Sequence, residues 1–558
     1  MASDDSKLRQ AVAAWQQLLG ADRVSASPQE LDGYGDSTLA QAVPPAGVIR
    51  ARSRDEVVEV VRVAGEFGVP LYPISRGKNW GYGDACPVGP DQFVLDLSLM
   101  NRIVEVDPEL AYAVVEPGVS QGQLHDHLEE KGYPLWNSCT GSSPDASVLG
   151  NLLERGFGMT AYSDHAAHAC GMEVVLADGT VLETGLGHYP NAPSRHLYRW
   201  GLGPNLDGLF TQSNLGVVVR AGIWLMARPD AFTTFRLTID RDADLEDAID
   251  RLRRLRLEGT LSSPVFIANA FRSLAQMRPY PWAETGGATP LTRDLAESML
   301  RESRVPGLTG RWNAIGSLHG TRRGMKAAVH DTKTGLRGLG RLYFTAPSTL
   351  DRFQRWGRLV SAIRPKRGRE IVGMVEGARP GVDVFRGVPS HQGLGISRWR
   401  LRRDIEGRCE DPTAEGCGLY WVAPVCPAKG SEVLRCVKII EENMLERSFE
   451  PLIRIAVAND RVVFITTLLA FDREDAAEAA RAGDCHRELV AKLLDEGYPP
   501  YRAGVTEMDL LDPNGSNHWG VVSTLKQALD PGAILAPGRY DPRTAAGFRT
   551  VGGASSGR

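Results

Sequence analysis

PISRGKNWGYG, residues 73–83, is the segment of the 558-residue sequence that says most about its architecture. The residues that lead into it, 69–75, are mostly apolar and predict a strand. Three glycines within its last seven positions predict a loop whose backbone approaches another group closely. Amides in such a loop can form a nest for a pyrophosphate, and Arg76 and Lys78 add positive charge. On its own the segment fits both a phosphate-binding loop and a surface loop with tight turns.

The residues around this loop predict a unit in which helices and strands alternate. Upstream, Ser53 and Glu56 form a capping box, followed by a run of valines and by Gly68, so a helix is expected between them. Downstream, the pattern predicts strands at 93–99, 103–106 and 112–116, a helix from Ser120 to Gly132, a hairpin at 171–184 and a strand pair at 215–226.

A second α+β unit is expected from Thr233 onward. Its predicted elements are strands at 233–239, 452–457 and 461–468 and helices at 243–257 and 473–496. The last segment, with a short helix at 523–529 and the sequence APGRY at 536–540, is too short to fold alone. We therefore expect an α+β fold with one domain at 1–229, to which 501–558 returns, and another at 230–500. The Gly/Ser-rich tail after Ala545 is expected to be disordered.

Composition and charge exclude several classes of function. With 64 Lys and Arg against 68 Asp and Glu, the net charge is −4, and no long block of Lys and Arg is present, so we expect no binding of nucleic acid, which requires a basic surface. A local basic patch is compatible with this balance. No stretch approaches the roughly 18 apolar residues of a membrane span, and the start lacks a secretory signal, so we expect a cytoplasmic protein that does not bind membranes. Eight cysteines without a Cys-x-x-Cys pair indicate free thiols and no metal site.

Several common motifs are absent. The sequence has no strict Gly-x-Gly-x-x-Gly, no Walker A loop and no His-Glu-x-x-His, so the usual dinucleotide, nucleoside triphosphate and zinc-protease interpretations lose their main support. GASSG at 553–557 matches the hydrolase nucleophile pattern, but it lies in the tail and not on a strand-to-helix turn. We discard it.

Further segments, in order along the chain, are shared with one family of flavoproteins. They are NSCTGSSPDASVLGN at 137–151, ERGFGMTAYSDH at 154–165, GMEVV at 171–175, DGLFTQSNLG at 207–216 and GIWLM at 222–226. With residues 73–83 in front of them, they resemble the FAD-binding domain of the vanillyl-alcohol oxidase and 4-cresol dehydrogenase flavoproteins. Tyr501-Arg502 and the segment 529–540 fit the same family, so the resemblance covers about residues 48–540.

The resemblance implies a fold and a cofactor. The fold is an FAD-binding domain of the p-cresol methylhydroxylase (PCMH) type, made of two α+β subdomains, with an α+β cap domain that carries an antiparallel sheet over the substrate. In this family loops of the two subdomains hold the diphosphate, which accounts for the missing Gly-x-Gly-x-x-Gly. The residues implied to bind FAD are Ser75, Arg76, Gly77, Lys78, Asn79, Gly141, Ser142, Pro144, Ser147, Asn151, Gly158, Asn214, Gly216, Val217 and Arg539.

Family members often attach FAD covalently through its 8α-methyl group, and Tyr420 falls near the attachment position. A tyrosyl link is implied in preference to a histidyl one, because no His stands there and none precedes His125. Non-covalent FAD, with Tyr420 as a core aromatic, is the alternative.

The resemblance implies oxidation of a para-alkylphenol or a 4-hydroxybenzylic alcohol, by hydride transfer from the benzylic carbon to flavin N5 through a para-quinone methide. This reaction favours the phenolate. A phenol has a pKa of about 10, so binding it ionised near pH 7 requires roughly 4 kcal/mol of differential stabilisation. Charge-assisted hydrogen bonds supply roughly 1.5–3 kcal/mol each, so two or three donors, one of them cationic, are sufficient.

Tyr82, Tyr501 and Arg502 fall where the family places its phenolate-binding groups. Asp145 matches an acidic residue near flavin N5 and is implied to accept a proton from the water or hydroxyl that adds to the quinone methide. Tyr162 matches a tyrosine of the phenolate network.

The implied partners are a small phenolic substrate, O2 or a cytochrome as electron acceptor, and a second copy of the chain in a homodimer. Two alternatives stay open. One is a flavin oxidase of the same fold that acts on a non-phenolic alcohol or amine. The other is a flavin-binding protein that carries electrons without oxidising a small molecule.

Overall fold

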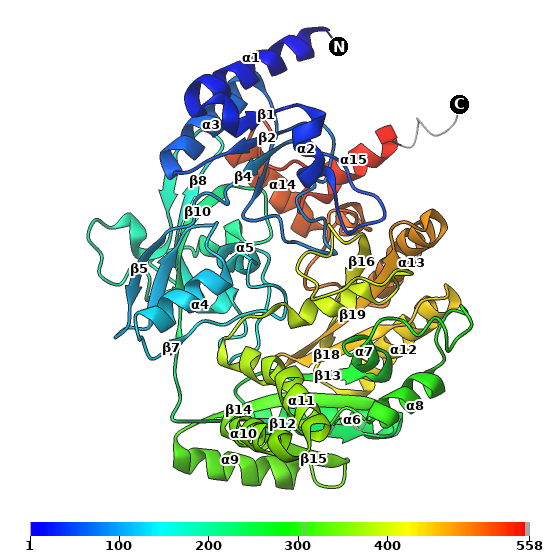
Figure 1. Cartoon of the computed structure of the whole chain (residues 1–558). Helices are drawn as coiled ribbons and strands as arrows, with labels where there is room; N and C mark the ends of the chain where they lie inside the picture. Colours follow the sequence, from blue (N-terminus) through cyan, green and yellow to red (C-terminus); the bar gives the residue numbers. More distant parts are fainter. Residues whose placement is uncertain (1, 304, 306, 553–558) are drawn as a thin grey trace.

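The N-terminal part of the chain builds a small sheet covered by helices (Figure 1). Strands β2 (Gly47–Arg50), β4 (Phe93–Asp96) and β3 (Leu71–Ile74) are parallel, and β1 (Val24–Ser25) is antiparallel to β2. Helices α1 (Ala2–Leu19) and α3 (Arg54–Phe67) share one hydrophobic core with these strands, and α2 (Pro28–Gly35) joins β1 to the segment before β2. The structure, a computed structural model, describes residues 2–303, 305 and 307–552.

Helix α3 begins and ends at the expected residues. Ser53 Oγ accepts the amide of Glu56 (3.2 Å), and Gly68 ends the helix with a left-handed backbone, φ 68°. The Glu56 carboxylate accepts the amide of Arg52 (2.7 Å), one residue before the position that a capping box predicts. The local signals of the sequence therefore suffice to set this element.

The second sheet is antiparallel, in the order β5 (Ile103–Asp107), β6 (Tyr112–Val115), β10 (Val217–Trp224), β8 (Ala169–Val175) and β9 (Val181–Glu183). Helices α4 (Gln121–Glu130) and α5 (Val148–Leu153) begin at side-chain caps from Ser120 and Ser147. Strands β8 and β9 form the expected hairpin. The strand pair expected at 215–226 is wrong, because β10 is one strand and β11 (Met226–Ala227) pairs instead with β7 (Leu135–Trp136).

The end of the chain adds to the first sheet. Leu71 exchanges backbone hydrogen bonds with the carbonyl of Ile534 and the amide of Ala536, both at 2.7 Å. Figure 1 shows the red helices α14 (Asn517–Leu529) and α15 (Pro542–Gly552) beside the blue N-terminal elements. The disorder expected after Ala545 is wrong up to residue 552, because α15 continues through these positions. The GASSG motif at 553–557 lies outside the described residues.

The remaining strands form an eight-stranded antiparallel sheet. Its order is β15 (Arg341–Thr345), β12 (Ala231–Ile239), β14 (Trp312–Gly320), β13 (Val265–Asn269), β18 (Leu452–Val457), β19 (Val462–Asp472) and β16 (Cys417–Val422), with β17 (Val425–Pro427) also paired to β19. We call this sheet and its helices the cap. Its strand β18 coincides with the expected range 452–457.

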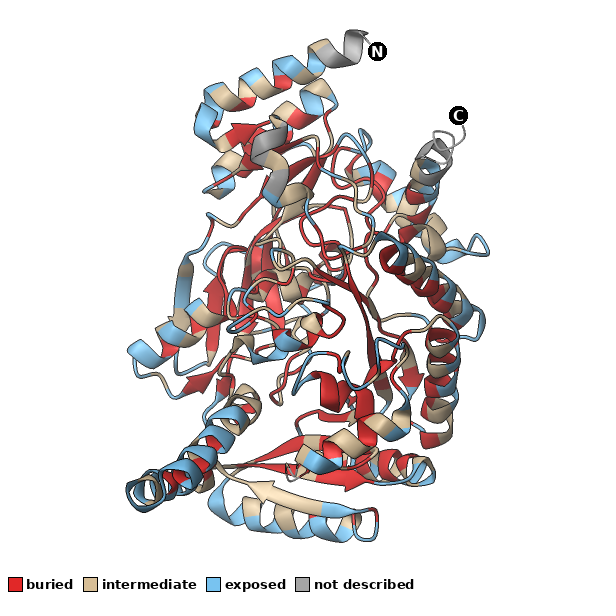
Figure 2. Cartoon of the chain, turned by 45° about the vertical axis from the view of Figure 1, so that its right-hand side comes forward, coloured by how far each residue is buried: buried red, intermediate tan, exposed pale blue. Residues whose placement is uncertain are grey.

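Helices α6 (Asp242–Leu257), α12 (Gly430–Glu446) and α13 (Ala476–Asp495) bury apolar side chains against one face of the cap sheet, and α9 (Arg322–Gly335) packs beside α6. On the other face, α7 (Ala270–Ala275) and α8 (Arg293–Ser303) share a smaller core with side chains of β16, β18 and β19. Helices α10 (Pro347–Ile363) and α11 (Pro365–Asp383) pack against each other as a hairpin. Figure 2 shows buried strands and helices whose outer faces are exposed. Among the described residues, no helix is both long and apolar enough to cross a membrane.

Candidate active site

A cavity of about 340 Å³ lies between the two N-terminal sheets and the cap. Its walls come from the loop after β3, the segment that leads into α5, the start of β10, residues 535–539 and the cap strands β16, β18 and β19. This size is typical of a small-molecule site. The residues expected to bind the cofactor that line it are Ser75, Arg76, Gly77, Lys78, Asn79, Gly141, Ser142, Ser147, Asn151, Asn214, Gly216, Val217 and Arg539.

The loop after β3 has the properties of a phosphate-binding nest. Gly77 has a left-handed backbone, φ 65°, and within the described chain the amides of residues 76–79 donate no hydrogen bond to protein groups. Such amides require an outside partner, and an anion is a suitable one. The Arg76 guanidinium lies beside them, held by the carbonyls of Asp145 (2.6 Å) and Gly118 (3.0 Å).

At other positions of the cavity wall, glycines allow the backbone to approach the cavity closely. A Cβ at Gly150 would lie 3.0 Å from Ser75 Oγ, and one at Gly216 would lie 2.5 Å from a Val174 methyl group. Side chains at these two positions would therefore displace the wall. The free amides, the added cation and the glycine-lined walls fit the diphosphate and the ring system of FAD.

Tyr82, Tyr501 and Arg502 meet in this cavity, although the first comes from the glycine loop and the others from the far end of the chain. The guanidinium carbon of Arg502 lies 4.3 Å from the centre of the Tyr82 ring. Burial, with a further contribution from the neighbouring Tyr501, raises the pKa of Tyr82 well above 10. Tyr82 is therefore a protonated hydrogen-bond donor at neutral pH.

A largely buried carboxylate, Glu154, partly compensates the positive charge of the cavity wall, and its side chain is 22% exposed. Glu154 accepts hydrogen bonds from Arg539 Nη2 (2.6 Å) and the Tyr540 hydroxyl (2.8 Å), and its carboxylate lies 3.5 Å from Arg502 Nε. Burial opposes ionisation of Glu154, but the charges of Arg539 and Arg502 outweigh it and lower its pKa. Two guanidiniums thus face one carboxylate, and one unit of positive charge remains for a ligand.

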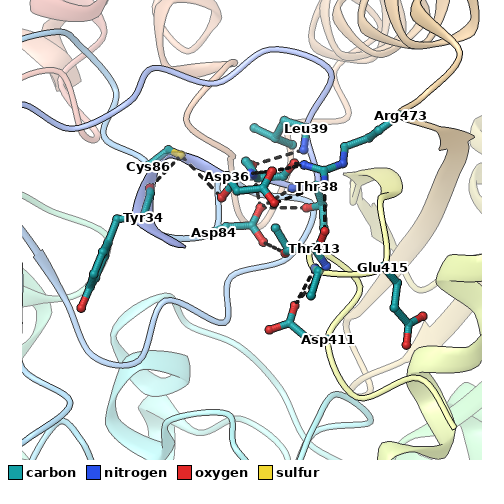
Figure 3. Close-up of polar contacts among 12 residues, drawn as sticks. Tyr34, Asp36, Thr38, Leu39, Asp84, Cys86, Asp411, Thr413, Glu415 and Arg473 are labelled. Carbon is teal, nitrogen blue, oxygen red and sulfur yellow. Dashed lines mark hydrogen bonds and ion pairs between the residues drawn. The ribbon is translucent and has the colours of Figure 1, made fainter. Parts of the chain in front are cut away.

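A second buried carboxylate, Asp84, lies two residues after Tyr82, and Figure 3 shows its contacts. Asp84 accepts hydrogen bonds from the Ser37 hydroxyl (2.6 Å), the Thr38 amide and hydroxyl (2.9 and 2.8 Å) and the Thr413 hydroxyl (3.0 Å). Burial raises the pKa of Asp84, although these donors act in the opposite direction. Ser37 and Thr38 belong to the N-terminal segment, and Thr413 lies just before β16. The hydrogen bonds of Asp84 therefore connect the loop that carries Tyr82 to the N-terminal segment and to the cap.

Tyr420, expected near the position of flavin attachment, is not among the residues that line the cavity. Its neighbours Leu419 and Trp421 line the cavity, and alternation along β16 directs Tyr420 to the opposite face of the sheet. There its ring stacks on His486, with 4.4 Å between ring centres, and its hydroxyl accepts the amide of Ala40 (3.1 Å). The side chain belongs to the largest hydrophobic core, as the core-aromatic alternative predicted.

Two expected catalytic residues also lie outside the cavity lining. The Asp145 side chain is 54% exposed, and its carboxylate lies 3.7 Å from His391 and 3.9 Å from Arg76. The hydrogen bond of Asp145 to the lining residue Arg76 comes from its backbone carbonyl and not from its carboxylate. The Tyr162 ring stacks on His168 at 4.3 Å, away from the phenol-binding groups.

Pro144 and Gly158, expected to bind FAD, support the wall from behind. The Pro144 carbonyl accepts the amide of Gly122 (2.8 Å). The Gly158 amide donates to the carbonyl of Ser163 (2.8 Å), and a Cβ at Gly158 would lie 2.3 Å from Ser138 Oγ. Close packing alone therefore requires glycine at this position.

The cap supplies lining residues that the sequence analysis did not single out. Leu419, Trp421 and Leu468 form an apolar wall, and Arg272 and Arg454 add two guanidiniums. Glu154 and Tyr540 were also missed, although both lie within segments that carry the family resemblance. Among the described residues, no group of three or more His, Cys, Asp or Glu side chains is placed to hold a metal ion.

The chain is similar to a known domain family over part of its length and to known proteins over nearly all of it. The model of the FAD binding domain family matches residues 45–185. The chain is 36% identical to the 1'-carboxy-chondrochloren decarboxylase of Chondromyces crocatus, over 96% of this chain and 98% of that protein. It is 31% identical to the flavoprotein subunit of 4-cresol dehydrogenase (hydroxylating) of Pseudomonas putida, over 96% of this chain and 95% of that subunit.

Solved structures agree over nearly the whole length. The structure of p-cresol methylhydroxylase with substrate bound matches with a TM-score of 0.84 at 30% identity, and covers 96% of this chain and 97% of that one. The 4-ethylphenol oxidase from Gulosibacter chungangensis matches with the same TM-score at 27% identity and the same coverage. The chain therefore belongs to the vanillyl-alcohol oxidase and 4-cresol dehydrogenase family, and it is an FAD-dependent oxidoreductase with the PCMH-type α+β fold.

Proposed function

We propose that the protein oxidises a para-substituted phenol at its benzylic carbon while Tyr82, Tyr501 and Arg502 bind the phenolate oxygen. The observation that carries this proposal is the approach of Arg502 to within 4.3 Å of the Tyr82 ring, beside Tyr501. When bound, FAD supplies the hydride acceptor for the benzylic carbon.

The charges of these residues suit a phenolate. Stabilising a phenolate at neutral pH requires roughly 4 kcal/mol, which two or three charge-assisted hydrogen bonds supply. Tyr82 remains a donor because its pKa is raised, and the unit of positive charge left over by Arg502, Arg539 and Glu154 attracts the anion. The surrounding rings, Phe157 and Phe464 beside Tyr501, exclude water and strengthen these interactions.

A second candidate reaction couples this oxidation to loss of a carboxyl group. It is favoured by the 36% identity to a protein named as a decarboxylase, over 96% of the chain. If the carbon next to the benzylic carbon bears a carboxylate, removal of the benzylic hydride gives a para-quinone methide. The electron pair of the C–CO2 bond then forms a carbon–carbon double bond, the ring becomes a phenolate again, and CO2 leaves. By this route 3-(4-hydroxyphenyl)propionate would give 4-vinylphenol.

The flavin attachment follows from the position of Tyr420. Because its hydroxyl lies on the far face of β16, bonded to the Ala40 amide, we propose that FAD is bound without a tyrosyl link. We also propose the domain division at 229/230 and 500/501, which places the cap sheet in one domain. The electron acceptor, the homodimer and the cytoplasmic location stay predictions.

Anaerobic mixing of the holoenzyme with 4-ethylphenol tests the main proposal through loss of the flavin absorbance. We expect rapid bleaching with 4-ethylphenol and none with 4-ethylanisole, whose methylated oxygen cannot ionise. Bleaching by non-phenolic alcohols or amines alone would support the oxidase alternative. Absence of bleaching with every compound would support an electron carrier.

A further inference from the structure

Two guanidiniums of the cavity wall have no carboxylate partner. Arg272, in α7, and Arg454, in β18, both line the cavity, and neither forms an ion pair with any described residue. The other cations of the lining differ from them: Lys78 pairs with Asp411 (2.6 Å), Arg502 and Arg539 share Glu154, and Arg76 lies 3.9 Å from Asp145. Charges inside proteins are normally paired, so these two call for a ligand.

Arg272 is almost fully buried, with only 4% of its surface exposed. One guanidinium nitrogen donates to the carbonyl of Leu452 (3.3 Å), and the guanidinium carbon lies 5.3 Å from the centre of the Trp421 ring. Its Nε is buried without a hydrogen-bond partner. Burial, and then repulsion from the charge of Arg454, lowers the pKa of Arg272 well below its usual value.

Arg454 lies nearer to the phenol-binding residues. Its Nε donates to the Thr466 hydroxyl (3.3 Å), and its guanidinium carbon lies 5.0 Å from the centre of the Phe266 ring. Burial lowers the pKa of Arg454, while Tyr501 and Tyr82 act in the opposite direction. The guanidinium carbon also lies 6.0 Å from the centre of the Phe157 ring, which is 5.6 Å from the centre of the Tyr501 ring. A ligand that reaches from the tyrosines to Arg454 therefore needs only a short chain.

The charge count of the site shows what such a ligand carries. The cluster of Arg502, Arg539 and Glu154 has one net positive charge, which a phenolate balances. Arg272 and Arg454 add two more, and the flavin ring system accounts for at most one negative charge when it is reduced, since the diphosphate of FAD is assigned to Arg76 and the nest of residues 76–79. One guanidinium is then left for a second anionic group on the substrate.

We propose that Arg272 and Arg454 bind a carboxylate on the para side chain of the phenolic substrate. The inference rests on the proposed phenol oxidation and narrows its substrate class to 4-hydroxyphenyl compounds with an acidic side chain. A planar carboxylate can accept two parallel N–H groups from one guanidinium, which a neutral alkyl chain cannot do. The apolar wall of Leu419, Trp421 and Leu468 accommodates the carbon chain between the two polar ends.

The test compares acids with their neutral amides of equal shape. The pairs are 4-hydroxybenzoate, 4-hydroxyphenylacetate and 3-(4-hydroxyphenyl)propionate with the corresponding primary amides. Dissociation constants come from titration calorimetry for the benzoate pair, which has no benzylic hydrogen, and from the concentration dependence of anaerobic flavin reduction for the others. We expect at least one acid to bind about tenfold or more tightly than its amide, as a charge-assisted hydrogen bond implies.

Variants test whether the two arginines cause the preference for an acid over its amide. Arg272→Gln and Arg454→Gln should bring the acid-to-amide ratio close to one while binding of the amides changes little, and Arg454→Lys should keep part of the preference. Arg379→Gln, which removes an exposed ion pair to Asp351 on the α10–α11 hairpin, is the matched control and should keep the full preference.

The outcomes separate this inference from the proposed function. If no acid of the three lengths binds more tightly than its amide, the carboxylate site is refuted, even when 4-ethylphenol bleaches the flavin. If the arginine variants lose bound FAD while the acid preference persists, the two arginines serve the cofactor and the inference is wrong. If no phenol bleaches the flavin, the proposed oxidation fails, and the benzoate pair still tests whether the arginines bind a carboxylate.

Discussion

Replacement of Arg502 by glutamine removes the cation nearest to the proposed phenolate while the polypeptide around it stays intact. Glu154 would keep its hydrogen bonds from Arg539 (2.6 Å) and Tyr540 (2.8 Å), so the change does not leave a buried carboxylate without partners. Arg502 also donates to the Asn79 side chain, a contact that glutamine can replace. The net charge of the cluster falls from one positive unit to zero.

The size of the effect follows from the lost charge-assisted interaction. Its contribution of roughly 1.5–3 kcal/mol corresponds to a rise of about one to two units in the pKa of the bound phenol. The second-order rate constant of flavin reduction by 4-ethylphenol should therefore fall about 10- to 150-fold near pH 7, and it should recover as the pH rises. With a ring-fluorinated 4-ethylphenol, whose hydroxyl is more acidic, the rate constant should fall by a smaller factor.

The assay is stopped-flow reduction of the flavin without oxygen, between about pH 6 and 10. Arg502→Lys should retain part of the rate, because it keeps the charge but not the planar fork. Tyr162→Phe, outside the cavity lining, is the control and should behave like the parent protein. An equal loss at every pH, or a loss that is the same for fluorinated and plain substrates, would refute the role of Arg502 in ionising the phenol.

Three further predictions concern other parts of the molecule. Tyr420→Phe should leave the flavin content unchanged, and acid precipitation should release FAD from both proteins; a yellow pellet from the parent protein alone would contradict the buried position of Tyr420. Asp84→Ala should lower the free energy of unfolding by about 1.5–3 kcal/mol in urea titrations, because it removes a charged hydrogen-bond acceptor. Asp126→Ala, at an exposed position, is the control and should have little effect. Burial lowers the pKa of His165 from 6.5 to about 4, so on acidification the unfolded chain binds a proton at this residue before the folded chain does. The free energy of unfolding should therefore fall as the pH drops from 6.5 to 4, and it should fall less in His165→Asn. An identical pH dependence of the two proteins would argue against the shift.

The parts of the fold that could be predicted carry their signal in neighbouring residues. The start and end of α3 follow from Ser53 and Gly68, and the glycine loop is recognisable because left-handed backbone at Gly77 and Gly81 favours glycine. Strand β18 could be predicted because five of the six residues at 452–457 are apolar, Arg454 being the exception. These interactions are local, so the amino-acid order alone specifies them.

The parts that could not be predicted depend on contacts between distant residues. In CGLYWV, residues 417–422, almost every side chain is apolar, so no alternation shows which face Tyr420 occupies. Along this strand, neighbouring positions face alternately the cavity and the hydrophobic core, so an error of one position exchanges the two. Asp145 and Glu154 are both acidic residues in the same segment, and only the folded chain shows that Arg539 and Tyr540 approach the latter. Arg272 and Arg454 come from separate elements, and nothing in their neighbours marks them as a pair.

The proposed oxidation depends on binding of the phenol as its anion. The ¹⁹F NMR shift of 4-fluorophenol, which has no benzylic carbon and is not oxidised in this way, reports directly whether its hydroxyl is ionised. We expect 4-fluorophenol bound to the holoenzyme at pH 7 to show the shift of the phenolate, and with Arg502→Gln the shift of the neutral phenol. A neutral-phenol shift in the parent protein would mean that Tyr82, Tyr501 and Arg502 do not ionise the phenol.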